Sequence, residues 1–470
     1  MSANENLNVA NIRVILDKQR AACLSGEPWT AEQRCELIDR AIGLLVDYQD
    51  EIIEALSADF GHRSQDFTRM LDVLGPLASL KYTKAKIAEW MQPELRASER
   101  GEAWVQYQPL GVVGILTAWN FPGNMVFNGL AGALAAGNRV MIKVSEYNPK
   151  TSALLARMFR EVYAEDEVAI ITGGADIGHA FCQQPFDHLL FTGSSSIGKQ
   201  VMRAAAENLV PVTLELGGKS PTIISRTADM KAAVSKIMTG KLHNAGQICL
   251  APDYVLVPEE QQEAFVAAAR EVVATLFPTL LDNPDYTSVI NSRHFERLHG
   301  YLNEARDAGI ELIELNPAGE NFDGQPHHKM VPTLLRNPGD ELQVMQDEIF
   351  GPLLPFKTYK SFAEVVSYIN SRPRPLGLYY FGSDADEESF VLNRTTSGGV
   401  TLNDVLRHGG VETLPFGGVG NSGMGCYHGI DGFRTFSHGK SVLRAADGPD
   451  AMRPPYSEQA RQFVGSMIKR

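Results

Sequence analysis

The segment HNAGQICLAPD (residues 243–253) places Cys249 after a glycine and a glutamine and shortly before a proline. A cysteine thiolate attacks carbonyl carbons, although a cysteine is also a common small apolar core residue. The only histidine nearby is His243, so the local sequence contains no Cys–His hydrolase pair, and the fold would have to supply His408 or His428. Cys249 alone leaves the nucleophile and the core residue as open alternatives.

Glu215 interrupts an apolar segment, VTLELGG (212–218), 34 residues before Cys249. A buried carboxylate without a partner is costly, so a chain that keeps one usually has a use for it. Burial would raise its pKa and suit it to general-base catalysis near neutral pH. The structural alternative is an ion pair between Glu215 and an Arg or Lys.

Two other segments place polar residues directly after apolar strands. In TAWNFPGN (117–124) the side-chain amide of Asn120 could donate a hydrogen bond to an oxyanion, or it could bond its own backbone at a turn. In RVMIKVSE (139–146) Lys143 and Glu146 could contact the ribose or phosphate of a nucleotide, or they could form a solvated charge pair.

The segment HLLFTGSSSIGKQVM (188–202) has an apolar strand, a turn through Gly193 and a helix beginning near Ser196. Helix N-termini that follow strands bind phosphate groups through free N–H donors. The spacing between Gly193 and Gly198 is GxxxxG rather than GxGxxG, and no GK[ST] P-loop is present. An ordinary strand-to-helix turn explains this pattern equally well.

The elements that position these residues follow from hydrophobic periodicity. Residues 8 to about 95 have the three- and four-residue spacing of helices, and Thr30 with Gln33 forms a capping-box pattern. Strands and helices alternate over 112–216 and again from about 225 to 400, which predicts parallel, doubly wound α/β sheets. The six glycines within residues 416–429 predict a loop that packs close to another backbone.

Composition limits the function classes. The 470 residues carry a formal net charge of −13, which makes nucleic acid an unexpected partner. The five cysteines are odd in number and contain no CxxC pair, so we expect no metal site, no disulfide framework and a reducing, cytoplasmic location. The first residues lack the apolar core of a signal peptide, and no apolar run is long enough to span a membrane.

Taken together, the motifs resemble those of the aldehyde dehydrogenase superfamily in order and approximate spacing, from about residue 20 to 445. The Glu-Leu-Gly-Gly-Lys-Ser-Pro run followed by Gly-Gln-x-Cys is highly specific. CLAPDYVLV and PFGGVGNSGMGCYHG look most like the class 3 branch, and within it the chain is similar to coniferyl-aldehyde dehydrogenases. The matching segments are WNFPGN, IKVSE, FTGSSSIGK, LELGGKSP, GQICLAPDY, EIFGP and LPFGGVGNSGMGCYHG.

The resemblance implies oxidation of an aldehyde to an acid through a covalent thioester. Cys249 would be the nucleophile, Asn120 and the Cys249 backbone N–H would hold the oxyanion, and Glu215 would activate the hydrolytic water. NAD is the expected cofactor, with NADP possible, because Glu146 should repel a 2′-phosphate. The resemblance implies six cofactor-binding residues: Lys143, Glu146, Gly193, Ser194, Glu348 and Phe350.

The family plan also implies a domain division and a homodimer. Residues 1–90 and 110–215 would form the NAD(P)-binding domain, and residues 216–417 the catalytic domain. Residues 418–436 would be a loop returning to the cofactor domain. Residues 91–109 and 437–447 would form a β bridging arm, followed by a C-terminal tail, 448–470.

Three alternatives remain open. A relative that passes the acyl group to coenzyme A or phosphate needs no water-activating base, so Glu215 argues against it. A thiol esterase would use Cys249 without a nicotinamide, and a non-catalytic protein would be expected to lack one of the three catalytic residues. The sequence does not specify the aldehyde, and the candidate tunnel residues are Tyr379, Tyr380, Phe381 and Arg407.

Overall fold

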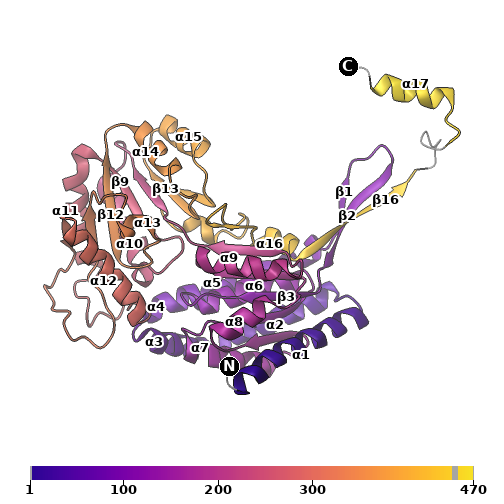
Figure 1. Ribbon diagram of the computed structural model, residues 1–470, viewed down its shortest axis with the longest axis horizontal. Helices are drawn as coiled ribbons and strands as arrows, with labels where there is room; N and C mark the ends of the chain where they lie inside the picture. The colour runs from indigo at the N-terminus through magenta and orange to yellow at the C-terminus, as the bar shows by residue number, and fades with distance from the viewer. Residues whose placement is uncertain (1–2, 447–453, 469–470) are drawn as a thin grey trace.

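The computed structural model describes residues 3–446 and 454–468, and its strands form three separate sheets (Figure 1). The first sheet has six strands, which are parallel except for the short antiparallel β15 at one edge. In spatial order the strands are β15 (Gly423–Met424), β7 (Val212–Leu216), β6 (His188–Gly193), β3 (Val112–Leu116), β4 (Arg139–Lys143) and β5 (Val168–Ile171).

The strands of this sheet are largely buried because helices cover both of its faces. The long apolar helix α6 is made almost entirely of small and apolar residues, and all but one of its residues are buried. A side chain at Gly129 would lie 3.1 Å from the Ile115 side chain, so small residues allow α6 to pack closely on β3. The helices of this part of the chain are α1 (Ala3–Ser25), α2 (Ala31–Asp47), α3 (Gln49–Phe60), α4 (Gln65–Thr68), the π-helix η1 (Arg69–Leu74), α5 (Gly75–Trp90), α6 (Pro122–Ala135), α7 (Pro149–Val162), α8 (Ala175–Cys182) and α9 (Ser195–Ala206).

The second sheet has seven strands, parallel except for the antiparallel edge strand β10. In spatial order they are β10 (Leu312–Glu314), β11 (Thr333–Arg336), β12 (Leu353–Tyr359), β9 (Tyr254–Pro258), β8 (Pro221–Ile224), β13 (Gly377–Phe381) and β14 (Gly399–Leu402). The helices of this part are α10 (Met230–Leu242), η2 (His243–Gly246), η3 (Glu259–Gln261), α11 (Gln262–Leu276), α12 (Ser292–Asp307), α13 (Gln343–Gln346), α14 (Phe362–Asn370), α15 (Ala385–Arg394) and η4 (Arg407–Gly410).

The third sheet is an arm that projects away from the body in Figure 1. It consists of β1 (Glu94–Arg96), β2 (Gly101–Pro109) and β16 (Ser437–Ala445). All nine residues of β16 pair antiparallel with β2, from Ser437 opposite Pro109 to Ala445 opposite Gly101. The C-terminal helix α17 (Glu458–Met467) lies beyond the arm, away from both larger sheets.

The doubly wound α/β fold with a second α/β unit and a β arm is thus as the sequence predicts, including the Thr30–Gln33 capping box. One expectation was wrong in detail. The glycine-rich segment is not entirely loop, because β15 pairs with β7, opposite Glu215 and Leu214, and α16 (Gly429–Thr435) follows it. Among the described residues, no helix is long and apolar enough to cross a membrane.

Candidate active site

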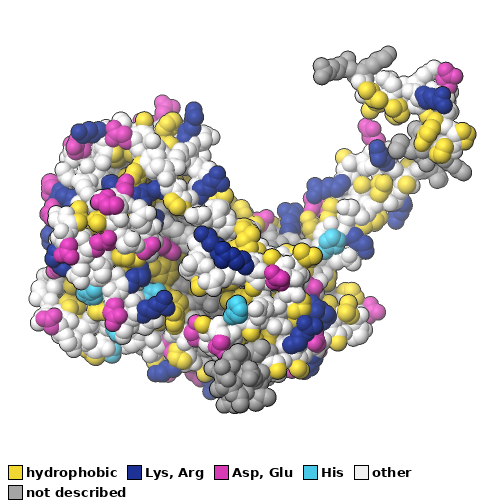
Figure 2. All heavy atoms as spheres, viewed as in Figure 1, with side chains coloured by type: hydrophobic (Ala, Val, Ile, Leu, Met, Phe, Trp, Pro, Cys, Tyr) yellow, Lys and Arg dark blue, Asp and Glu magenta, His cyan; other side chains and the backbone are white. Residues whose placement is uncertain are grey.

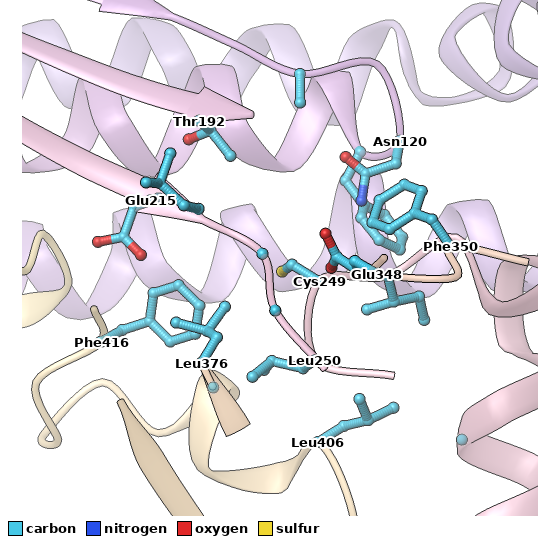
Figure 3. Close-up of a pocket in the computed structure, with 18 of the residues that line it drawn as sticks. Asn120, Thr192, Glu215, Cys249, Leu250, Glu348, Phe350, Leu376, Leu406 and Phe416 are labelled. Atoms are coloured by element: carbon cyan, nitrogen blue, oxygen red, sulfur yellow. The ribbon is translucent and has the colours of Figure 1, made fainter. Parts of the chain in front are cut away.

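A cavity of about 1490 Å³ lies where the two large sheets face each other, and it brings together most of the residues that the sequence singles out (Figure 3). Its wall includes seven of the nine predicted catalytic and cofactor residues, namely Asn120, Gly193, Ser194, Glu215, Cys249, Glu348 and Phe350. Lys143 and Glu146 are absent from this wall. Figure 3 shows the Cys249 side chain between Glu215 on one side and Asn120 and Phe350 on the other.

A sharp turn presents Cys249 to the cavity. Asn244, Ala245 and Gly246 all have left-handed backbone conformations, with φ of 49°, 52° and 76°. A side chain at Gly246 would lie 2.3 Å from the carbonyl oxygen of Gly351, so only glycine fits there. The Gln247 side chain donates to the Asn244 and Ser288 carbonyls, at 2.8 and 3.0 Å, and holds the turn rigid.

Burial, with smaller contributions from the nearby carboxyl groups of Glu348 and Glu215, raises the pKa of the Cys249 thiol to about 12. The backbone N–H groups of Cys249 and Leu250 act in the opposite direction because they stabilise a thiolate. The thiol of the free enzyme is therefore protonated at neutral pH. It must lose its proton before it can attack a carbonyl carbon.

Glu215 lies on β7 with only 3% of its surface exposed. Neither of its carboxyl oxygens has a hydrogen-bond partner among the described residues, so the ion-pair alternative does not account for it. Burial raises the pKa of this carboxyl well above its usual range. Glu215 therefore combines burial, a free pair of oxygens and a position on the cavity wall, as a general base requires.

The side-chain amide of Asn120 points toward the Cys249 turn rather than toward its own backbone. Its Nδ2 donates to the Gln247 carbonyl at 3.1 Å, which connects β3's carboxyl end to the turn. The amide has a second N–H, and Asn120 lines the cavity. Asn120 is thus placed to donate to a group bound beside Cys249.

Glu348 and Phe350 reach the cavity from the loop before β12. A side chain at Gly217 would lie 1.8 Å from the Glu348 carboxylate, so this glycine makes room for it. Burial, and to a lesser degree the nearby Asp253, raises the pKa of Glu348 to about 8. The loop is held by Lys219, whose Nζ pairs with Asp253 and donates to the Val344 and Asp347 carbonyls at 2.7 and 2.8 Å.

Gly193 and Ser194 lie at the junction of β6 and α9. Ser194 is the N-cap of α9, and its Oγ accepts a hydrogen bond from the Ile197 N–H at 3.4 Å. The first turn of this helix faces the cavity with its N–H donors, which favours a phosphate group there.

Lys143 and Glu146 lie at the carboxyl end of β4, apart from the cavity wall. Lys143 is buried, donates to the Val144 carbonyl at 2.7 Å and lies 3.5 Å from Glu146. Glu146 is partly exposed, with 40% of its side chain accessible. The pair therefore has the geometry of the charge pair that the sequence left open as an alternative.

The predicted tunnel residues were mostly wrong. Tyr379, Tyr380 and Phe381 are fully buried in β13 and belong to the cores on either side of the second sheet, whereas Arg407 does line the cavity. The apolar wall that sequence reasoning missed is formed by Phe67, Leu71, Phe121, Met125, Ile248 and Leu406. These residues come from helix ends and loops, where periodicity gives no signal.

No histidine is hydrogen bonded to Cys249 in the described part of the chain. The ring of His408 bonds the Thr401 hydroxyl at 2.7 Å, and that of His428 stacks on Phe416. His243, which lines the cavity, packs against Phe67 instead, with ring centres 4.9 Å apart. The geometry does not favour a Cys–His hydrolase.

Comparison with known proteins identifies the family of the chain. The model of the aldehyde dehydrogenase family matches residues 4–442. This chain belongs to the aldehyde dehydrogenase family. It is 52% identical over 458 residues to a coniferyl aldehyde dehydrogenase of Pseudomonas sp., with 96% of this chain and 95% of the relative covered. It is also 38% identical to aldehyde dehydrogenase family 3 member A2 of Mus musculus, with 93% of this chain and 90% of the relative covered.

Solved aldehyde dehydrogenase structures share its fold. The substrate-bound AldH of Staphylococcus aureus superimposes with a TM-score of 0.91 at 34% identity, covering 97% of this chain and 99% of that one. The Mycobacterium tuberculosis aldehyde dehydrogenase complexed with NAD+ gives a TM-score of 0.85 at 28% identity, covering 94% and 92%. The expected family, fold and oxidoreductase class are confirmed.

The raised pKa of Cys249 predicts how this aldehyde dehydrogenase reacts with iodoacetamide in the absence of cofactor. Because only the thiolate reacts, the alkylation rate should rise steadily between pH 7 and pH 9, by up to about tenfold per unit. Glu348→Gln should react faster than wild type at pH 9, since it removes a negative charge beside the sulfur. Glu146→Gln, outside the cavity, should not change the rate. A plateau reached below pH 8 in a stopped-flow or mass-spectrometric assay would contradict the raised pKa.

Proposed function

We propose that this enzyme oxidises an aromatic aldehyde of the coniferyl type to its carboxylic acid, with NAD as the cofactor. The observation that carries the proposal is the convergence of Cys249, Asn120 and an unpartnered, buried Glu215 in one cavity. The apolar wall of the cavity suits an aromatic ring, and the Pseudomonas relative is named for coniferyl aldehyde.

In the first half of the reaction, the Cys249 Sγ releases its proton to solvent water and forms a bond to the aldehyde carbon. The carbonyl oxygen becomes an oxyanion, which the Asn120 side-chain amide and the Cys249 backbone N–H stabilise. Each such donor contributes roughly 3 kcal/mol in the transition state. The apolar surroundings of the cavity strengthen these hydrogen bonds because they exclude water.

The residues of the cavity fit a dinucleotide. The free N–H groups at the start of α9 suit its pyrophosphate, and Glu348, whose Oε1 has no partner among the described residues, suits a ribose hydroxyl. Gly193, Ser194 and Phe350 would complete the contacts, with Lys143 and Glu146 at the adenosine ribose. When bound, the nicotinamide supplies the acceptor for the hydride that leaves the former aldehyde carbon.

In the second half, Glu215 takes a proton from a water molecule, whose oxygen attacks the thioester carbon. The C–S bond breaks, the acid leaves and Cys249 regains a proton. The raised pKa of Glu215 makes it a stronger base than an exposed glutamate. An enzyme that passes its acyl group to coenzyme A or phosphate does not need this base, so Glu215 favours the hydrolytic reaction.

Glu215→Gln should stop the enzyme after one turnover. With excess coniferyl aldehyde and NAD, we expect about one equivalent of NADH per active site, followed by a steady rate reduced on the order of 100-fold or more. Mass spectrometry of the quenched variant should find the acyl group on Cys249. Cys249→Ala should show neither the burst nor the adduct. Multiple turnover by Cys249→Ala would overturn the proposal, and so would a wild-type enzyme that turns over only when coenzyme A is added and then forms the acyl-coenzyme A thioester instead of the free acid.

The cofactor and substrate preferences are tested by rates with the wild-type enzyme. Glu146 should repel the 2′-phosphate of NADP, so kcat/KM should be higher with NAD, and Glu146→Gln should narrow that difference. Among short aliphatic, long aliphatic and cinnamyl-type aldehydes, the cinnamyl type should give the highest kcat/KM. A preference for a short aliphatic aldehyde would contradict the proposed substrate class.

We also propose that the chain works as a homodimer in the cytoplasm. The five cysteines are free, as a reducing compartment requires. The arm carries exposed apolar residues, among them Leu95 and Leu443, and Figure 2 shows yellow side chains along the arm and on α17, apart from the body. The domain division proposed from the sequence places this arm, 91–109 and 437–447, between two subunits.

The dimer is tested at the arm. The wild-type chain should elute with the mass of two copies in light-scattering chromatography at micromolar concentration. Leu443→Asp should shift it toward one copy, because it places a charge in an apolar contact. Leu209→Asp is a matched control. Leu209 is also an exposed leucine, but it lies on the body, after α9. A wild-type chain that elutes only as a monomer would contradict the dimer.

A further inference from the structure

Behind Asn120 lies an ion pair that is completely enclosed by protein. The Arg63 Nη2 lies 2.7 Å from Asp72 Oδ2, and neither side chain has any exposed surface. Arg63 follows α3, and Asp72 belongs to the π-helix η1. An isolated charge would not be stable there, so each residue depends on the other.

The two members of this pair bind Asn120 itself and the segment that follows it. Arg63 Nη1 donates to the backbone carbonyl of Asn120 at 2.8 Å. Asp72 Oδ1 accepts from the backbone N–H groups of Gly123 and Asn124, at 3.0 and 3.2 Å, in the first turn of α6. The pair thus fixes both the backbone carbonyl of Asn120 and the start of α6, which begins at Pro122.

The surroundings hold the guanidinium in place. Arg63 lies over the rings of Phe60, Phe121 and Phe67, at 4.8, 5.0 and 5.9 Å from their centres. Burial raises the pKa of the Asp72 carboxyl, and the Arg63 guanidinium and the two N–H donors oppose that shift. In this water-free environment the hydrogen bonds are directional and strong, so they restrain the backbone of Asn120.

Buried ion pairs often stabilise a fold no better than apolar residues would. Their geometry is what distinguishes them, because charge-assisted hydrogen bonds from a planar guanidinium are directional and specify the positions of their partners. Here the pair fixes the backbone of Asn120, from which the side-chain amide extends toward the cavity. A displacement of about 1 Å in a group that stabilises a transition state costs on the order of 100-fold in rate.

We propose that Arg63 and Asp72 are positioning residues that hold the Asn120 amide at the oxyanion. This inference rests on the role proposed for Asn120. The pair touches neither the aldehyde nor the cofactor, since neither residue lines the cavity. It acts on the rate through the orientation of a single side chain.

The test compares Arg63→Lys with a matched control, Arg34→Lys. Arg63 binds next to the start of α6, whereas Arg34 binds its end. Arg34 is also buried, and its Nη1 donates to the Ala135 carbonyl at 2.8 Å, at the last residue of α6. Both Lys variants keep the charge and lose the planar fork. Arg63→Lys should lower kcat about 10- to 100-fold and leave the Kd for NADH unchanged, whereas Arg34→Lys should keep kcat within about twofold at a similar loss of Tm.

A double-mutant cycle with Asn120→Ala separates positioning from general destabilisation. If Arg63 acts through Asn120, the double variant should be no slower than Asn120→Ala alone. Equal fold losses from Arg63→Lys in both backgrounds would overturn the inference, and so would an unchanged kcat in Arg63→Lys. If Asn120→Ala itself keeps full kcat, the proposed role of Asn120 fails first. Asp72→Asn, which keeps an acceptor for the α6 N–H groups, provides an independent second variant.

Discussion

The site depends on carboxyl groups that the fold buries in the cavity wall. Glu215 and Glu348 flank the Cys249 thiol. Neither Glu215 oxygen is hydrogen bonded to the described protein, whereas Lys219 and Arg297 partly offset the charge of Glu348. Such burial costs folding free energy. The cost is maintained because the same desolvation makes Glu215 basic and raises the pKa of the Cys249 thiol. Desolvation is therefore the origin both of the raised pKa values at the site and of the cost in folding free energy.

A rigid scaffold is needed to hold these groups in place. The carboxyl ends of the first sheet's strands face loops that precede several strands of the second sheet, so residues from distant parts of the chain meet in the cavity. The Cys249 turn is fixed by Gln247, and the loop of Glu348 is fixed by Lys219 and Asp253. Hydrogen-bonded residues thus support the reactive groups from behind.

Much of this arrangement could be predicted from sequence because its signals are local. A glutamate inside an apolar strand predicts a buried carboxylate, and polar residues directly after strands predict a shared edge of a parallel sheet. The substrate side could not be predicted in this way. Tyr379, Tyr380 and Phe381 have an aromatic composition that fits a tunnel, but every residue of β13 is buried between neighbouring strands and helices. The contact between Arg63 and Asn120 joins residues 57 positions apart and follows no periodicity.

The pairing of β2 with β16 has a consequence for biosynthesis. Gly101 pairs with Ala445, so β2 is made long before its second partner, β16, leaves the ribosome. Until then, β2 has an open edge next to half-exposed side chains, and open strand edges invite wrong association. Both large sheets can be completed earlier, from strands that end before the arm's last strand begins. The order of translation therefore separates the folding of the catalytic body from the closure of its arm.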